Sequence, residues 1–248
     1  MPFFTMARFD FEETFGEDYL YFYGDFLSDE HNDADVDAIV SILGLTGGEG
    51  VLDAPCGHGR ISNRLADRGV TVVGVDATEL FLARAREYGS SAEYLHGDIR
   101  ALPVDGPFDV VLSWFTSFGY FDDDENRQVL AEYRRVLRPG GRLLIEMHNH
   151  DEFVRRFTPA PFSITTRVEN DLMVDTSEFD CMTGRIETDR VVIRDGQIRE
   201  SHHSVRIPTI PELREWLTEA GFASSTFTAR DGKQPSIHRN RLVVIATA

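Results

Sequence analysis

The stretch VLDAPCGHGR, residues 51–60, decides the fold of this chain. An apolar run ends at Asp53, a turn containing Gly57 and Gly59 follows, and a helix is expected to begin near Arg60. Glycine permits positive φ angles and close approach of a ligand to the backbone at no steric cost. A strand, a glycine turn and a helix N-terminus together aim backbone N–H groups at the polar end of a ligand. The stretch therefore predicts an α/β fold with a ligand site at the end of its first strand.

Strand-like and helix-like segments alternate after this turn. Strands are expected over residues 50–54, 70–75, 92–96, 108–113 and 142–147, and helices over 59–68, 78–88 and 124–137. Helical periodicity resumes in PELREWLTEAGF, and two strands near 222–229 and 240–247 end the chain. Near-continuous apolar strands separated by helices indicate a parallel sheet that is buried on both faces. The predicted architecture is a doubly wound α/β sheet.

Two segments depart from this alternation. Residues 10–44 predict two amphipathic helices, separated by an acidic linker around residues 28–35. Residues 162–207 hold alternating runs split by turn signals, of which Asp195-Gly196 is a strong hairpin signal. We expect three or four antiparallel strands there, inserted into the α/β fold. The predicted organisation is one domain over residues 1–248, with an N-terminal helical cap over 1–46 and an antiparallel β-insert over 160–207.

The composition argues against several classes of protein. A net charge of −17 disfavours nucleic acid and anionic membranes as partners, because both are bound through clustered Lys and Arg. No apolar run approaches the roughly 20 residues that span a bilayer, and the start of the chain shows no signal peptide. Two cysteines give no disulfide framework, and no cluster has metal-ligand spacing. We therefore expect a cytoplasmic protein, monomeric or homodimeric, without a metal, a nucleic-acid partner or a membrane partner.

Acidic residues follow the second and third predicted strands. Asp76 lies about twenty residues beyond the glycine turn, where a carboxylate can accept hydrogen bonds from both hydroxyls of a ribose. Asp98, in HGDIRALP, can accept from the exocyclic amine of adenine, with Ile99 packed on the base. The alternatives are a helix N-terminal acid favoured by the macrodipole and a loop-capping aspartate. Together with the glycine turn, the two acids favour a nucleoside cofactor.

With these residues in place, the chain resembles the class I S-adenosylmethionine-dependent methyltransferases. The matching pieces occur in the order and at the spacing of the family, over roughly residues 35–150: VLDAPCGHGR, VVGVDAT, HGDIRALP, FDVVLSWFTSFGYF and VLRPGGRLLIEM. The resemblance implies a three-layer, seven-stranded, mostly parallel sheet with an antiparallel last strand. The helical N-terminus and the β-insert make the chain similar to small-molecule methyltransferases of this family.

The resemblance also implies a role for each matching position. Asp53 and the backbone of residues 54–59 would hold the methionine end of S-adenosyl-L-methionine, and Asp76 would hold the ribose. Asp98 and Ile99 would hold the adenine, and the backbone after the fourth strand would line the cofactor near its sulfonium. With two helix tyrosines, the expected cofactor-binding residues are Asp53, Ala54, Gly57, Gly59, Asp76, Ala77, Asp98, Ile99, Ser113, Trp114, Tyr19 and Tyr23.

The two tyrosines and a later aromatic segment are expected around the site. Tyr19 and Tyr23 lie four residues apart on one face of the first helix. They either close over the cofactor and shape the acceptor pocket or only pack against the rest of the protein. Trp114 and Tyr120 follow the fourth strand at the ligand edge of the sheet, and we expect both in the pocket wall.

Histidines are the candidates for proton transfer. His148 follows the fifth strand at the ligand edge and is the best candidate for a general base, because imidazole titrates near neutral pH. The alternative is that His148 hydrogen-bonds a nearby loop. His150 would point the other way if the strand continued, and His202 and His203 are expected at the surface.

The predicted function is transfer of a methyl group from S-adenosyl-L-methionine to nitrogen or oxygen of a small-molecule acceptor. A nicotinamide-dependent oxidoreductase is the competing class, but Ser62 stands where its fingerprint needs a third glycine or alanine. A non-catalytic module that keeps the cofactor fold is the third possibility. Binding and turnover experiments distinguish the three.

Overall fold

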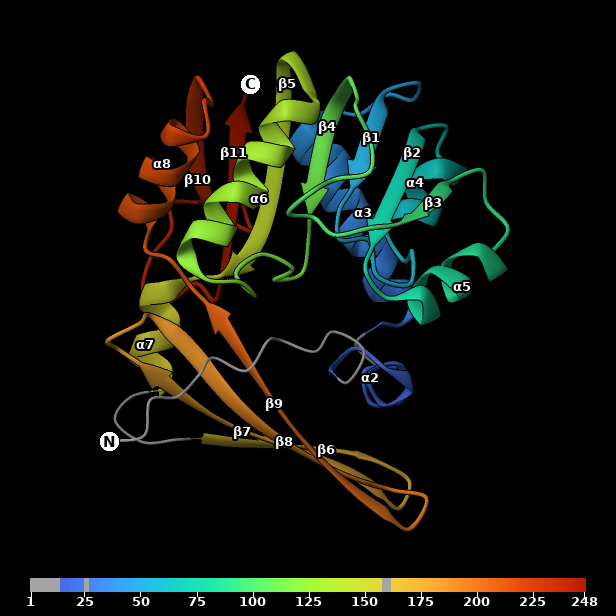
Figure 1. The fold of residues 1–248 in the computed structure, drawn as a ribbon, viewed down its shortest axis with the longest axis vertical. Coiled ribbons are helices and arrows are strands. Elements are labelled where there is room, and N and C mark those ends of the chain that lie inside the picture. Colours follow the sequence, from blue (N-terminus) through green and yellow to red (C-terminus); the bar gives the residue numbers. More distant parts are fainter. Residues whose placement is uncertain (1–13, 25–26, 158–161) are drawn as a thin grey trace.

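Residues 14–24, 27–157 and 162–248 are described by the computed structural model, and they form two sheets (Figure 1). The seven-stranded sheet has the order β10-β11-β5-β4-β1-β2-β3, in which only β11 runs antiparallel to its neighbours. Its strands are β1 (Gly50–Asp53), β2 (Thr71–Asp76), β3 (Glu93–His96), β4 (Phe108–Ser113), β5 (Leu137–His148), β10 (Ser224–Ala229) and β11 (Arg241–Thr247). The predicted doubly wound sheet with an antiparallel last strand is confirmed.

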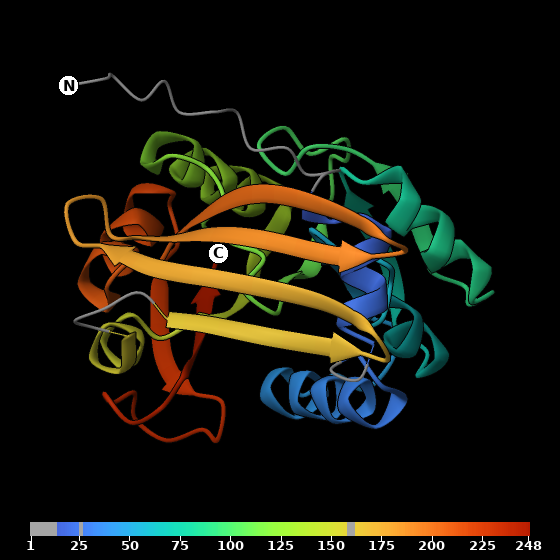
Figure 2. The same ribbon diagram turned by 90° about the horizontal axis from the view of Figure 1, so that it is seen from below.

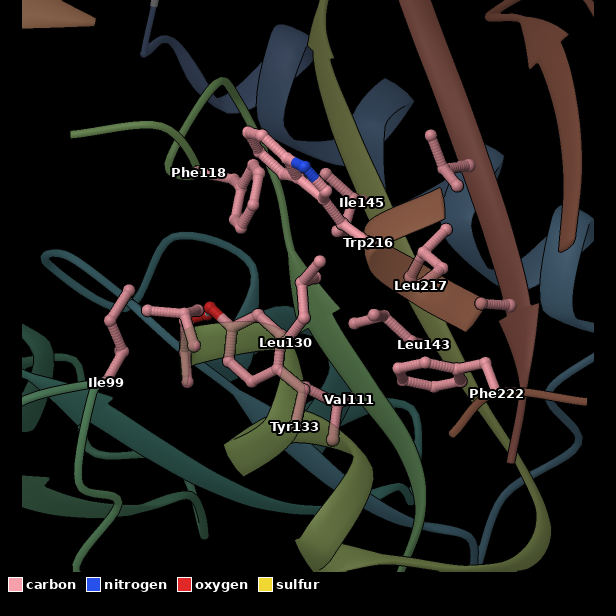
Figure 3. Close-up of a cluster of buried hydrophobic side chains, with 14 of the residues drawn as sticks. Ile99, Val111, Phe118, Leu130, Tyr133, Leu143, Ile145, Trp216, Leu217 and Phe222 are labelled. Atoms are coloured by element: carbon pink, nitrogen blue, oxygen red, sulfur yellow. The ribbon is translucent and has the colours of Figure 1, made fainter. Parts of the chain in front are cut away.

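Successive residues of a strand point to opposite faces of the sheet, and here both faces are apolar. Helices therefore cover both faces of this sheet. On β5, Leu143 and Ile145 pack into the cluster under α6 and α8, shown in Figure 3, whereas Leu144 packs into the cluster under α3 and α4. The helices of the described residues are α2 (Glu17–Phe22), α3 (Asp29–Leu43), α4 (Ser62–Asp67), α5 (Glu79–Glu87), α6 (Asp123–Val136), α7 (His150–Phe157) and α8 (Ile210–Glu219).

The second sheet is the β-insert, whose four antiparallel strands lie in the order β6-β7-β8-β9. The strands are β6 (Phe162–Val168), β7 (Asp171–Asp180), β8 (Arg185–Arg194) and β9 (Gln197–Arg206), joined by tight turns where the sequence predicted them. Figure 2 shows this sheet lying across one end of the α/β sheet, with α2 and α7 between the two layers in Figure 1. The end that it covers is the one where the parallel strands β1, β2, β4 and β5 finish.

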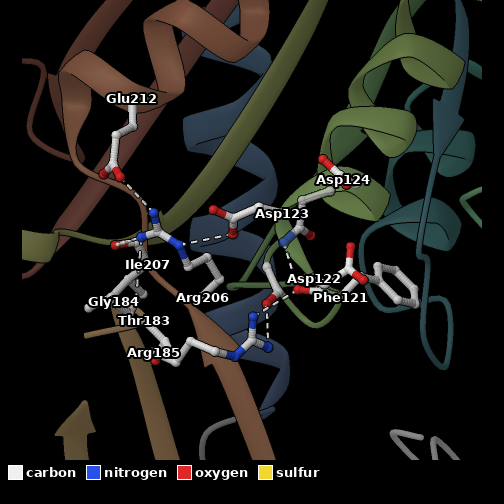
Figure 4. Close-up of polar contacts among 12 residues, drawn as sticks. Phe121, Asp122, Asp123, Asp124, Thr183, Gly184, Arg185, Arg206, Ile207 and Glu212 are labelled. Atoms are coloured by element: carbon white, nitrogen blue, oxygen red, sulfur yellow. Dashed lines mark hydrogen bonds and ion pairs between the residues drawn. The ribbon is translucent and has the colours of Figure 1, made fainter. Parts of the chain in front are cut away.

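Two buried arginines attach the insert to the α/β sheet (Figure 4). Arg185 on β8 donates to the carbonyl of Phe121 at 2.8 Å. Arg206 on β9 pairs with Asp123 on α6 at 3.1 Å and with Glu212 on α8 at 2.6 Å. Because each guanidinium is buried and bonded on several sides, the insert is held at a fixed place over the strand ends.

The prediction of an acidic linker around residues 28–35 was wrong. These residues begin α3, and their carboxylates pair with arginines on and just before α4. Asp35 is buried and accepts from Arg60 at 2.7 Å. The prediction also missed α7, and β5 begins at Leu137 rather than at residue 142.

The boundaries of the helical cap and the insert stay predictions. Within residues 1–46, α2 lies at the insert, whereas Val36, Ile39 and Leu43 of α3 belong to the core of the α/β sheet. No helix among the described residues is long and apolar enough to cross a membrane.

Candidate functional site

A cavity of about 530 Å³ lies between the ends of the parallel strands and the insert. One half is lined by the loops after β1, β2 and β4 and the loop after β3. The other half is lined by β7, β8 and β9 of the insert and by α7, with α2 at the side. A volume of this size is typical of a small-ligand site.

Asp76 organises the glycine turn at the floor of the first half. Its carboxylate accepts from the backbone N–H of Gly57 at 2.7 Å and of Thr78 at 2.9 Å. Burial raises the pKa of Asp76, and these backbone hydrogen bonds oppose the shift. The side chain therefore fixes the turn and lines the cavity together with Ala77.

Asp53 closes the same floor from the end of β1. Its side chain is buried and accepts from the Ser62 hydroxyl at 2.5 Å. Burial raises its pKa to about 7, and the hydrogen bond from Ser62 opposes the shift. Ala54, next along the chain, does not line the cavity. It is fully buried, its N–H donates to the carbonyl of Leu112, and its carbonyl accepts from the Tyr133 hydroxyl.

Gly59 also stands behind the cavity wall. It has a φ of 76°, and a Cβ at this position would lie 2.6 Å from the Tyr94 hydroxyl and 2.7 Å from the Ala85 Cβ. The glycine therefore permits α5 and β3 to pack closely behind the turn, whereas Gly57 lines the cavity.

Asp98 and Ile99 reach the cavity from the loop after β3. The Asp98 carboxylate is already engaged by Arg100, which donates from Nη2 at 2.6 Å and from its backbone N–H at 2.8 Å. Ile99 is buried and presents an apolar surface. The pair can offer an acceptor and a packing surface to a flat ring, with Arg100 fixing the carboxylate.

The loop after β4 has an unusual backbone. Phe115 and Thr116 both have positive φ angles, 67° and 57°, which cost free energy in residues other than glycine. The Glu146 carboxylate holds the loop by accepting from the Phe115 N–H at 3.0 Å. Trp114 lines the cavity, whereas Ser113 is fully buried behind it.

Aromatic side chains form the side of the cavity. Tyr19 and Tyr23 are stacked with ring centroids 4.5 Å apart, and Tyr23 accepts from Arg190 at 3.2 Å. Burial raises the pKa of both phenols, so they are neutral at physiological pH. Tyr120, predicted in the pocket wall, is among the lining residues.

The inner face of the insert supplies the roof. Strand pairing places Asp175 opposite Arg190 and Ser177 opposite Thr188, and both pairs line the cavity. Arg190 is bonded to Asp175 at 2.7 and 2.8 Å. His203, opposite Thr188 in the register, also lines the cavity, so its predicted surface position was wrong.

His148 lies where the sequence placed it, at the end of β5 on the cavity wall. Burial and the nearby Arg241 cation lower its pKa to about 3. The other two histidines of the cavity behave alike, since burial lowers the pKa of His58 and of His203 to about 4. All three imidazoles are therefore neutral and weakly basic.

These depressed pKa values predict acid sensitivity. A histidine with a folded pKa below its unfolded value of 6.5 binds a proton more readily in the unfolded chain, so stability falls as pH falls below 6.5. His148→Gln should flatten the fall in unfolding free energy between pH 6.5 and 5 by about 1.4 kcal/mol per pH unit. Urea titrations at several pH values measure this slope.

His202 offers the matched control for this slope. Burial opposes protonation of this half-exposed ring, but hydrogen bonds to the carboxylates of Asp189 and Glu187 prevail and raise its pKa. Its effect therefore has the opposite sign, and His202→Gln should steepen the loss of stability in acid. Equal slopes for wild type and His148→Gln would contradict the assignment.

The residues present fit a nucleoside cofactor with an amino-acid end. The backbone of the glycine turn and the carboxylates of Asp53, Asp76 and Asp98 surround one half of the cavity. A side chain at Gly57 would meet only the Phe81 ring, at 3.9 Å, so the space above this glycine is open to a ligand. S-adenosylmethionine, the cofactor that the resemblance implies, would supply an electrophilic methyl group there.

Comparisons with known proteins agree with this fold. Residues 51–141 match the family model described as a methyltransferase domain. Demethylmenaquinone methyltransferase of Renibacterium salmoninarum is 34% identical over 116 residues, which cover 46% of this chain and about half, 48%, of that relative. The CcbJ methyltransferase of Streptomyces caelestis has a similar structure, with a TM-score of 0.80, 22% identity and coverage of 97% of this chain and 99% of its own. CalS10 of Micromonospora echinaspora, an amino pentose methyltransferase with S-adenosylmethionine bound, has a TM-score of 0.67 and 23% identity, with 98% of each chain covered.

The fold and the matched residues define the class. Residues 51–141 match a methyltransferase domain, and the sheet around them has the fold of solved methyltransferases such as CcbJ. The predicted fold is confirmed, and residues 51–141 match a methyltransferase domain, as the resemblance implied.

Proposed function

We propose that the protein transfers a methyl group from S-adenosylmethionine to an amine nitrogen of a small-molecule acceptor. The observation that carries this proposal is the division of one cavity into two chemically different halves. The half at the glycine turn offers the carboxylates and backbone groups expected for the cofactor, and the half under the insert remains for the acceptor. Of the predicted site residues, those on the loops after the parallel strands belong to the first half: Asp53, Gly57, Asp76, Ala77, Asp98, Ile99 and Trp114. Tyr19, Tyr23 and His148 also line the cavity.

Nitrogen is favoured over oxygen by the protonation states around the acceptor half. A hydroxyl acceptor needs a base to take its proton as the bond to carbon forms. The histidines that line the cavity are weak bases and its tyrosines are neutral. Of the carboxylates in the acceptor half, Asp175 is bonded to Arg190 and Glu152 accepts from Arg155. A neutral amine needs no such base: its lone pair forms the N–C bond, the S–C bond breaks with its electrons left on sulfur, and the ammonium product loses its proton to water.

The chain would then act mainly through positioning and exclusion of water. The fixed insert covers the strand ends, and the stacked Tyr19 and Tyr23 close one side. The name of CalS10, an amino pentose methyltransferase, supports a small amine-bearing acceptor by analogy of fold alone. A cytoplasmic location and a monomeric or homodimeric state stay predictions from the sequence.

Two measurements test the proposal. Isothermal titration should find one site for S-adenosylhomocysteine, and NADH should compete with it weakly or not at all. Transfer of label from methyl-labelled S-adenosylmethionine should then be compared between amines and alcohols that share one carbon skeleton. Label in the amine supports the proposal, label in the alcohol contradicts nitrogen transfer, and absence of S-adenosylhomocysteine binding refutes the cofactor site.

A further inference from the structure

Three side chains lie side by side where β5 and β11 pair, at the cavity wall. The antiparallel register places Arg241 directly opposite His148 and Val243 opposite Glu146. Because Glu146 and His148 are two residues apart on one strand, their side chains share a face with Arg241. The guanidinium of Arg241 therefore lies between a carboxylate and an imidazole.

The donors of Arg241 are divided between these two neighbours. Its Nε and Nη2 both donate to the Glu146 carboxylate, which is fully buried. Its Nη1 lies 3.4 Å from Nδ1 of His148. Glu146 also accepts from the backbone N–H of Phe115, so the position of the guanidinium is fixed to the strained loop after β4.

An arginine has only donors, so any hydrogen bond from Nη1 requires a lone pair on Nδ1 of His148. A neutral imidazole with its lone pair on Nδ1 carries its proton on Nε2. Nε2 lies on the side of the ring away from Arg241, and no described residue forms a hydrogen bond with it. His148 lines the cavity, and its Nε2–H group is therefore the donor of this ring left for a ligand.

We propose that Arg241, held by Glu146, is a positioning residue that fixes His148 as the Nε2–H tautomer and makes it a hydrogen-bond donor to the methyl acceptor. This inference rests on the proposed function and changes the role expected for His148. The ring binds a lone-pair-bearing atom of the acceptor molecule other than the reacting nitrogen, whose lone pair must stay free to attack, and removes no proton. Other charged groups that line the cavity are Arg60, Asp53, Asp76, Asp98, Glu152, Arg156, Asp175 and Arg190.

The tautomer can be measured directly without knowing the acceptor. The full chain is labelled with ¹⁵N-histidine, saturated with S-adenosylhomocysteine, and studied by long-range ¹H–¹⁵N spectra from pH 5 to 9. The His148 signals are those that disappear in His148→Gln. We expect the neutral Nε2–H pattern at every pH, while His202 titrates in the same spectra as an internal control. An Nδ1–H pattern, or titration of His148 near pH 6.5, would overturn the proposal.

A variant tests whether Arg241 causes this state. Arg241→Lys keeps a cation beside Glu146. A single ammonium group cannot form two parallel hydrogen bonds to the Glu146 carboxylate and also reach His148. We expect a mixture of both tautomers of His148. Arg199→Lys, on the exposed end of β9, is the matched control and should leave the His148 pattern unchanged. An unchanged Nε2–H pattern in Arg241→Lys would remove Arg241 from this role.

If Arg241→Lys fails to fold, the double variant Glu146→Met/Arg241→Met replaces the whole buried pair and leaves no unpaired charge. The same tautomer mixture is expected, and a retained Nε2–H pattern contradicts the proposal. Failure of the proposed function can be distinguished from failure of this inference. It would appear as missing cofactor binding or missing amine methylation. The tautomer of His148 can still be measured in the wild-type protein without cofactor.

Discussion

Asp76→Ala is expected to lower the affinity for S-adenosylhomocysteine by more than about 100-fold. In the proposed site the carboxylate accepts from the ribose hydroxyls, and two charge-assisted hydrogen bonds contribute about 1.5–3 kcal/mol each. The variant also removes the acceptor for the N–H groups of Gly57 and Thr78, so the turn itself loses its anchor. Isothermal titration measures the affinity, and circular dichroism verifies that the variant folds.

Two variants calibrate the result. Asp76→Asn keeps one acceptor oxygen and should lose less affinity than Asp76→Ala. Glu79→Ala removes an exposed acid three residues further along, in the first turn of α5, and should leave the affinity within about twofold, as expected for a surface residue. If Asp76→Ala binds as Glu79→Ala does, Asp76 does not hold the cofactor.

Gly119→Ala should be the most damaging small substitution for stability. Gly119 has a φ of 108°, and its carbonyl accepts from the Arg206 N–H at 2.7 Å. A Cβ at this position would lie 2.2 Å from the carbonyl oxygen of Arg206, which is backbone and cannot move without displacing β9. We expect the unfolding free energy to fall by more than about 4 kcal/mol, in the range of severe steric and backbone strain.

The matched control is Gly48→Ala. Gly48 also has a positive φ, 87°, but no atom lies within 4 Å of the added Cβ. Backbone strain alone should cost about 1–2 kcal/mol there. Urea unfolding measures both variants. Similar losses would mean that the close approach of Gly119 to β9 adds nothing to the cost of backbone strain.

The α/β sheet could be predicted from the sequence because local patterns determine it. Apolar runs such as FDVVLS and turns such as the one at Gly57 and Gly59 carry their structure within a few residues. Asp53, Asp76 and Asp98 were also placed correctly at the strand ends, since parallel strands of a doubly wound sheet end at one edge.

The acceptor half could not be predicted, because it depends on pairing between distant strands. His203 faces the cavity only because β9 pairs with β8 in the register that sets it opposite Thr188, and a shift by one residue would expose it. The partnership of Glu146, His148 and Arg241 likewise depends on the pairing of β5 with β11. Residues 28–35 were misassigned because acidic residues usually indicate solvent, whereas here their arginine partners lie about thirty residues away, on and before α4.

In the β-insert, the residues that attach the sheet to the rest of the protein differ from the residues that line the cavity. Arg185 and Arg206 bond at the base of the sheet, to Phe121, Asp123 and Glu212. The side chains that line the proposed acceptor half project from other positions of β7, β8 and β9. Substitutions at those positions, such as Ser177 or Thr188, can change the molecule that is accepted without loosening the attachment. One stable framework could in this way serve a series of enzymes that differ only in the inner face of a four-stranded sheet.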